Sequence, residues 1–287
     1  MDPRQFASTG NWSPADRTNL FVVERGADRK GPPLVFLHGI PTWSWLWRNV
    51  LPVTARAARS VAIDLPGFGL SDRSPWQTFS VPSMAATLHA VLDRIAGSGA
   101  PVAVACHDFG ALVAAEMIHQ QPGRIARLVI TNTSLRAHAW GGGGPLRILG
   151  APLLGDLSMM LARRWMLRVA MTPFVADECA RTPDVVAGYW YPFEAGFGRA
   201  LARLYRERPV QSADFDRWRS ALAGFSSESL ILWGERDPAF TLDDATDIVD
   251  LLPNSRYLGF QNASHFLPEE RPKAVGRGIA AFLTGTR

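Results

Sequence analysis

The 287-residue sequence has little of several features that define common protein classes. Its two cysteines, Cys106 and Cys179, are too few and too far apart for a disulfide framework or a zinc-binding spacing, which fits a reducing compartment. Lysine occurs only at Lys30 and Lys273. The positive charge is almost entirely arginine, scattered without a run of five or six like charges, so we expect no nucleic-acid partner.

The sequence also lacks an uninterrupted apolar run long enough to cross a membrane. Residues 146–171 are rich in Leu and Met, but Arg, Gly, Pro and Asp interrupt them before the roughly 18 residues that a span needs. The first 14 residues contain no apolar h-region, so no secretory signal is expected. We therefore predict a cytoplasmic protein without a membrane span.

Short apolar runs that are typical of strands alternate with longer helical patterns. With 47% hydrophobic and 20% charged residues, the chain can bury a large core. The first run, residues 19–24, is expected to be antiparallel. Later strands are expected at 33–39, 60–69, 101–108, 126–132, 229–237 and 255–265, with helices at 81–99, 111–121 and 272–283. This order predicts an α/β fold with a mostly parallel sheet covered by helices.

Residues 135–222 interrupt that alternation with helical segments that are rich in Trp, Met and Arg. A long insertion between two strands of such a fold is typically a lid. We predict a core domain of residues 1–134 and 223–287 and a helical cap domain of residues 135–222.

One stretch at a predicted strand end has the form of a nucleophile elbow. In "CHDFG", Asp108 stands between small residues at a strand-to-helix turn, where the helix N-terminus favours an anion. By itself, Asp108 could equally be a helix N-cap. Asp237 and His265 lie at the ends of the last two predicted strands, in the order nucleophile, acid, histidine, and together the three predict a catalytic triad. Asp64 precedes them and is assigned a structural turn.

The chain resembles α/β-hydrolases of the haloalkane dehalogenase and epoxide hydrolase branch. The resemblance is carried by "HGIPTWSWLWRNV", "DLPGFGLSD", "CHDFG", "WGERDP" and "ASHFLPEERP", and it covers nearly the whole chain from residue 20. It implies a lid inserted between strands. The run beginning "HGIPT" and the lid sequence "YWYPF" are closer to the dehalogenases. Asn132 stands where one dehalogenase subgroup keeps a Glu.

An aspartate at the elbow, where most of the superfamily has serine, limits the reactions and substrates that are possible. A carboxylate that attacks a saturated carbon forms an ordinary ester, which His265 would hydrolyse by activating water while Asp237 orients its ring. The backbone N–H groups of Ile40 and Phe109 would form the oxyanion hole. Candidate substrates are small hydrophobic alkyl halides, epoxides and strained rings such as β-lactones. No cofactor or metal is expected.

The chain differs from the dehalogenases at two positions that would contact the leaving group. Those enzymes usually bind the halide with a Trp after the nucleophile and an Asn or Glu after "HG", where this chain has Phe109 and Ile40. A lid tryptophan could supply one N–H for a halide, and a lid tyrosine could protonate an epoxide oxygen; "LYRER" resembles the epoxide hydrolase lid. The predicted substrate-binding and lid residues are His38, Trp43, Trp140, Trp165, Tyr189, Trp190, Tyr191 and Tyr205.

We therefore predict a haloalkane dehalogenase-like hydrolase that acts as a monomer or homodimer. The alternatives are an epoxide hydrolase, a β-lactone-opening enzyme and a non-catalytic binding protein on the same fold, since a fold does not determine a function.

Overall fold

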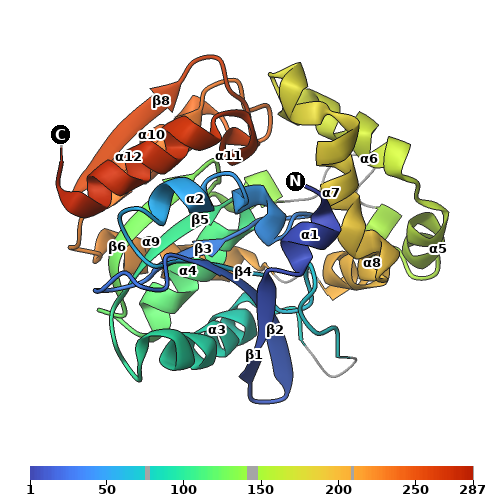
Figure 1. Ribbon diagram of the computed structural model, residues 1–287. Coiled ribbons are helices and arrows are strands. Elements are labelled where there is room, and N and C mark those ends of the chain that lie inside the picture. Colours follow the sequence, from blue (N-terminus) through green and yellow to red (C-terminus); the bar gives the residue numbers. More distant parts are fainter. Residues whose placement is uncertain (75–77, 141–147, 208–209, 287) are drawn as a thin grey trace.

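In the computed structural model, the described residues are 1–74, 78–140, 148–207 and 210–286, and their strands form one eight-stranded sheet (Figure 1). The strand order is β1-β2-β4-β3-β5-β6-β7-β8, with β2 antiparallel to both neighbours and the other pairs parallel. The predicted α/β fold with a mostly parallel sheet is thus confirmed. The strands are β1 (Gly10–Ala15), β2 (Thr18–Arg25), β3 (Leu34–Leu37), β4 (Ser60–Ile63), β5 (Val102–His107), β6 (Ile125–Thr131), β7 (Ser229–Gly234) and β8 (Ser255–Phe260).

Helices cover both faces of the sheet because alternate residues of each buried strand point to opposite sides. On β3, Val35 and Leu37 join the core beneath α3, α4, α9 and α10, whereas Leu34 and Phe36 join the core beneath α2 and α12. The helices of these two layers are α2 (Leu51–Thr54), α3 (Val81–Ala96), α4 (Phe109–Gln120), α9 (Ser212–Ala223), α10 (Leu242–Leu251) and α12 (Pro272–Thr284).

The segment between β6 and β7 contains mostly helices, which Figure 1 shows gathered on one side of the sheet. Its last helix, α9, packs against α4 and so returns the chain to the sheet before β7. The described helices of the segment before α9 are η2 (Ala137–Trp140), α5 (Leu154–Leu161), α6 (Arg164–Met171), η4 (Thr172–Phe174), η5 (Glu178–Arg181), α7 (Pro183–Glu194) and α8 (Phe197–Glu207). The division into core and cap domains remains a proposal.

Two local features differ from the sequence expectation. Strand β4 ends at Ile63 because the buried carboxylate of Asp64 turns the chain: its oxygens accept the backbone N–H groups of Ser44 and Leu70, each at 2.7 Å. In addition, β1 pairs with β2 in an unanticipated hairpin. Its edge position tolerates Pro14, which weakens the strand pattern in the sequence.

The remaining short helices are α1 (Pro3–Ala7), η1 (Ser44–Trp47) and α11 (Leu267–Glu270). None of the helices in the described part of the chain is both long and apolar enough to span a membrane.

Candidate active site

Asp108 occupies a strained turn between β5 and α4. Its backbone angles, φ 53° and ψ −125°, lie in a region that residues other than glycine rarely adopt. Backbone strain of this kind is typical of functional sites. The turn is possible because its neighbours are small. A Cβ on Gly110 would come within 2.6 Å of the carbonyl oxygen of His38, and one on Gly39 within 2.2 Å of Asp108 Oδ1. The elbow geometry predicted from "CHDFG" is therefore present.

The carboxylate of Asp108 faces the two predicted oxyanion-hole donors. The N–H of Ile40 donates to Oδ1 at 2.7 Å, and the N–H of Phe109 also favours the charged carboxylate. Only 6% of Asp108 is exposed. Burial raises the pKa of Asp108 above its ordinary value, although the charge of His265 and these N–H groups oppose the rise.

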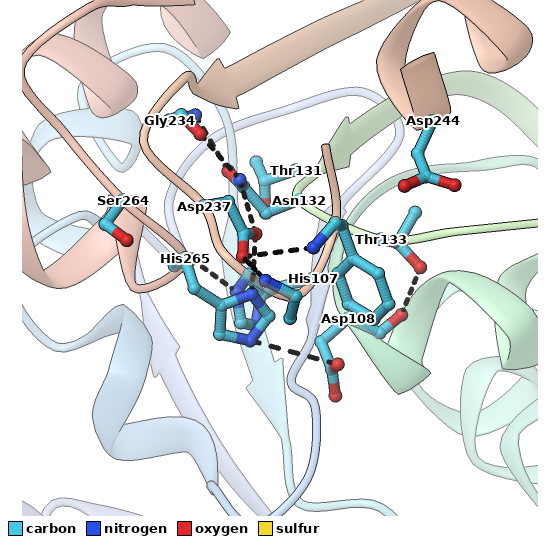
Figure 2. Close-up of polar contacts among 12 residues, drawn as sticks. His107, Asp108, Thr131, Asn132, Thr133, Gly234, Asp237, Asp244, Ser264 and His265 are labelled. Carbon is cyan, nitrogen blue, oxygen red and sulfur yellow. Dashed lines mark hydrogen bonds and ion pairs between the residues drawn. The ribbon is translucent and has the colours of Figure 1, made fainter. Parts of the chain in front are cut away.

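His265 lies between the carboxylates of Asp108 and Asp237, its two partners in the predicted triad (Figure 2). Its Nδ1 is 2.8 Å from Asp237 Oδ2, and its Nε2 is 3.9 Å from Asp108 Oδ2. The first distance is a hydrogen bond and the second is longer than one. Burial acts to lower the pKa of His265, but the charges of Asp237 and Asp108 outweigh it and raise the pKa. The structure thus brings Asp108, His265 and Asp237 together, and the Asp237 carboxylate orients the His265 ring.

Asn132 contributes to this arrangement in a way that sequence reasoning did not foresee. Its Nδ2 donates to Asp237 Oδ2 at 2.8 Å and to the Gly234 carbonyl at 3.1 Å, while its Oδ1 accepts the Gly234 N–H at 2.9 Å. The side chain therefore joins the ends of β6 and β7 and fixes Asp237. Its position at a strand end, where related sequences keep an acid, was the only signal.

Asp237 is further held by backbone donors on its own loop. Its Oδ1 accepts the N–H groups of Ala239 at 2.8 Å and Phe240 at 3.1 Å. Burial would raise the pKa of Asp237, but the charge of His265 and these hydrogen bonds lower it overall. Asp237 is thus favoured as a carboxylate beside the imidazole.

His107, directly before Asp108, is a second residue that the sequence analysis missed. Its Nε2 lies 2.9 Å from the His265 carbonyl oxygen and donates to it, and the two rings are 4.7 Å apart. Burial and the neighbouring His265 lower the pKa of His107 to about 3, so the ring is neutral. It holds the loop that carries His265.

His38 and Trp43, predicted to bind substrate, are fully buried. The Leu65 N–H donates to His38 Nε2 at 3.0 Å, so Nδ1 carries the proton and donates to the Gly39 carbonyl. Burial lowers the pKa of His38 to about 4. The indole N–H of Trp43 donates to the Gly188 carbonyl at 2.9 Å. Both side chains therefore use their N–H groups within the protein.

The predicted lid tryptophans occupy three different environments. The Trp140 indole N–H donates to the Ser134 carbonyl at 2.9 Å, and its ring lies 6.1 Å from Phe109. Trp165 is 66% exposed on α6. Trp190 stacks on Phe193 at 4.9 Å. The N–H of Trp140, whose ring contacts the residue after the nucleophile, is thus already committed.

The lid tyrosines also differ from one another. Tyr189 is buried and its hydroxyl donates to Glu269 at 2.8 Å, whereas the Tyr191 ring packs 6.0 Å from Trp43. Burial, together with the nearby charge of Asp108, raises the pKa of Tyr205 to about 12. Within the described residues, the Tyr205 hydroxyl makes no hydrogen bond. Tyr205 is therefore a protonated donor that lies close to Asp108.

Aromatic rings surround His265. Phe174, Phe240 and Phe266 lie 5.4–5.8 Å from the His265 ring, centroid to centroid. These apolar neighbours limit water and suit a hydrophobic substrate. No group of three or more His, Cys, Asp or Glu within the described ranges is arranged to hold a metal ion.

Comparisons with known proteins agree with this architecture. Residues 32–142 match the family described as alpha/beta hydrolase fold. A cis-3-alkyl-4-alkyloxetan-2-one decarboxylase of Xanthomonas campestris pv. campestris is 26% identical over 88% of each chain. A haloalkane dehalogenase of Mycolicibacterium paratuberculosis is 29% identical over 88% of this chain and 83% of its own.

A solved structure extends the likeness to the whole fold. The haloalkane dehalogenase DbeA from Bradyrhizobium elkani USDA94 superposes with a TM-score of 0.82 at 22% identity, over 96% of this chain and 97% of that one. The chain is therefore an α/β-hydrolase-fold protein whose relatives include haloalkane dehalogenases and an epoxide hydrolase.

Proposed function

We propose that this chain is a hydrolase in which Asp108 forms a covalent ester with a small hydrophobic substrate, and that a strained cyclic ether, an epoxide, is the substrate class. The observation that carries the proposal is the pair of Asp108 and His265, whose Oδ2 and Nε2 atoms are 3.9 Å apart, and it is supported by the buried Tyr205 hydroxyl, whose pKa the charge of Asp108 raises. The first supplies a nucleophile and a base, and the second supplies a proton for an oxygen leaving group.

The first step opens the ring. One oxygen of the Asp108 carboxylate attacks an epoxide carbon, the carbon–oxygen bond breaks, and the Tyr205 hydroxyl gives its proton to the departing oxygen. Because the pKa of Tyr205 is raised to about 12 by burial and by Asp108, the hydroxyl is protonated at neutral pH. The product of this step is a hydroxyalkyl ester of Asp108.

The second step hydrolyses that ester. His265 Nε2 takes a proton from water as the water attacks the Asp108 carboxyl carbon, with Asp237 holding Nδ1 at 2.8 Å. The N–H groups of Ile40 and Phe109 stabilise the oxyanion. Each such donor typically contributes about 3–4 kcal/mol. Collapse breaks the ester carbon–oxygen bond, and the departing alkoxide takes the proton of the new Asp108 carboxylic acid to give the diol and the free carboxylate. The proton on His265 returns to the Tyr205 phenolate.

An alkyl halide is the second candidate, supported by the haloalkane dehalogenase relatives. The local chemistry favours it less. A halide leaving group in an apolar site needs N–H donors, and Ile40 and Phe109 have apolar side chains while the Trp140 N–H is bonded to Ser134. A β-lactone, the ring type in the name of the Xanthomonas relative, is a third substrate to test.

Trapping the ester tests the proposal. In His265→Gln protein, ester formation should survive while hydrolysis slows by about 10²–10⁴-fold. Intact-protein mass spectrometry after incubation with a terminal alkyl epoxide should show one added epoxide mass, and peptide mapping should place it on Asp108. A primary alkyl bromide and a β-lactone are run in parallel, because the added mass identifies which group is transferred.

Two matched variants control this experiment. Asp108→Asn combined with His265→Gln should form no adduct, and His119→Gln, which alters an exposed histidine, should turn over without accumulating one. An adduct from the bromide alone would replace the epoxide assignment with the halide one. No adduct from any of the three electrophiles would instead favour a non-catalytic binding protein.

The predicted cytoplasmic location and the monomeric or homodimeric state remain predictions of the sequence.

A further inference from the structure

Helices α5 and α6 lie at the periphery of the helices between β6 and β7 (Figure 1), and they present apolar side chains to solvent. The exposed fractions of these side chains range from 43% to 82%. The exposed set, which we call the α5–α6 face, is Leu153, Leu154, Leu157, Met160, Leu161, Trp165, Met166 and Val169. Large apolar side chains that are exposed in such number on two successive helices indicate an interaction site.

One side of each helix packs on the protein, so the exposed side chains do not belong to a frayed helix end. On α6, Leu167 and Met171 pack toward the core, so Trp165 and Val169, one turn apart, point the other way. On α5, Gly155 packs against the Leu149 backbone and Met159 packs on the core, and the opposite side is again leucine. Each helix therefore has two apolar faces, of which the protein covers one.

Positive charge borders the α5–α6 face. Arg163, Arg164 and Arg168 are exposed, and no carboxylate of the described residues lies within ion-pair distance of them. The one acidic residue on these two helices, Asp156, is already paired with Arg206 at 2.7 Å. A patch of exposed leucines with unpaired arginines at its border complements an anionic surface.

A hollow beside Trp165 provides a place for one anionic group. It has a volume of about 240 Å³ and is lined by Arg164, Trp165, Arg168, Pro183 and Val186. A hollow lined by Arg164 and Arg168 suits a phosphate, because arginine binds phosphate oxygens through paired N–H donors. The hollow adjoins the exposed side chains of α6.

We propose that the α5–α6 face docks on the surface of an anionic lipid bilayer, with its leucines, Met160 and Trp165 in the interface and a lipid phosphate in the hollow. A second copy of this chain fits less well, because a two-fold contact through this face would oppose the arginines of one protomer to those of the other. Docking of this kind requires no membrane-spanning helix. The inference concerns the cap surface and does not depend on the chemistry proposed for Asp108.

Vesicle co-sedimentation of the whole chain tests the proposal. We expect the protein to bind phosphatidylcholine vesicles that contain equal phosphatidylglycerol and to bind pure phosphatidylcholine much less. Each arginine near an anionic surface contributes about fivefold to partitioning, so Arg164→Gln with Arg168→Gln should weaken binding by about thirtyfold. Val169→Glu, at a position that is 62% exposed, should weaken binding without affecting folding.

Matched variants elsewhere on the surface complete the test. Arg29→Gln with Lys30→Gln removes two exposed charges, and Leu242→Glu adds a charge at another exposed leucine; both should bind anionic vesicles as the unmodified chain does. The proposal is overturned if the unmodified chain does not bind anionic vesicles, or if the controls lose binding equally. It is also overturned if light scattering shows a dimer that Val169→Glu dissociates.

Discussion

Replacing Glu269 by Gln should destabilise the protein far more than the loss of an ordinary surface ion pair. Glu269, on α11, receives two hydrogen bonds of 2.6 Å from Arg48 and one of 2.8 Å from the Tyr189 hydroxyl on α7. The Arg48 and Glu269 side chains are only 6% and 3% exposed. The cluster therefore ties α7 to the segment that follows His265.

The expected magnitude follows from the charge that is left behind. Arg48 also lies 4.1 Å over the Trp45 ring and cannot reach water without disturbing that packing. Leaving one member of a buried pair without its partner typically costs about 3–5 kcal/mol in the free energy of unfolding. For a chain of this length, the unfolding entropy converts that loss into a fall in melting temperature of about 5–8 °C.

Thermal unfolding monitored by calorimetry would measure this effect. Glu228→Gln, in an exposed pair with Arg256, is the matched control and should cost less than about 1 kcal/mol. Arg48→Met combined with Glu269→Leu should recover most of the stability, because it removes both buried charges. If Glu269→Gln and Glu228→Gln lower the melting temperature equally, or if the double variant is the least stable, the reasoning about the unpaired charge is wrong.

Two further predictions concern the catalytic step. Tyr205→Phe should slow epoxide opening by about 10²–10⁴-fold while leaving the melting temperature nearly unchanged. Tyr257→Phe, at an exposed tyrosine, is the control and should leave the rate unaffected. An unaltered rate in Tyr205→Phe would exclude Tyr205 as the proton donor. Burial acts to lower the pKa of His265, but the charges of Asp237 and Asp108 raise it, and ester formation removes the Asp108 charge. The base of the ester intermediate should therefore have a lower pKa than in the free protein. The rate of ester hydrolysis, measured in single turnovers, should reach its maximum above that pKa and should fall about tenfold per pH unit below it. A rate that rises as the pH falls would contradict the role of His265 as base.

Much of the site could be predicted because it depends on local chain chemistry. Small residues around Asp108 permit the turn, and the following helix favours an anion there. The parallel sheet then brings the ends of β5, β7 and β8 to one edge, so the order of Asp108, Asp237 and His265 was enough to place them together. The hairpin of β1 and β2 was missed because Pro14 and a polar sequence conceal an edge strand.

What the sequence by itself determined is the mostly parallel α/β class and the identity of the groups at the strand ends, since strand pattern and turn sterics act between near neighbours in the chain. Only the tertiary structure decided which polar groups remain free. Asn132 bonds Asp237 across 105 positions in the chain, and Trp43 bonds Gly188 across 145. The periodicity of α5 and α6 likewise indicates two apolar faces, but packing alone selects the one that is covered. Such pairings depend on how distant segments meet, and short-range sequence patterns carry no record of that.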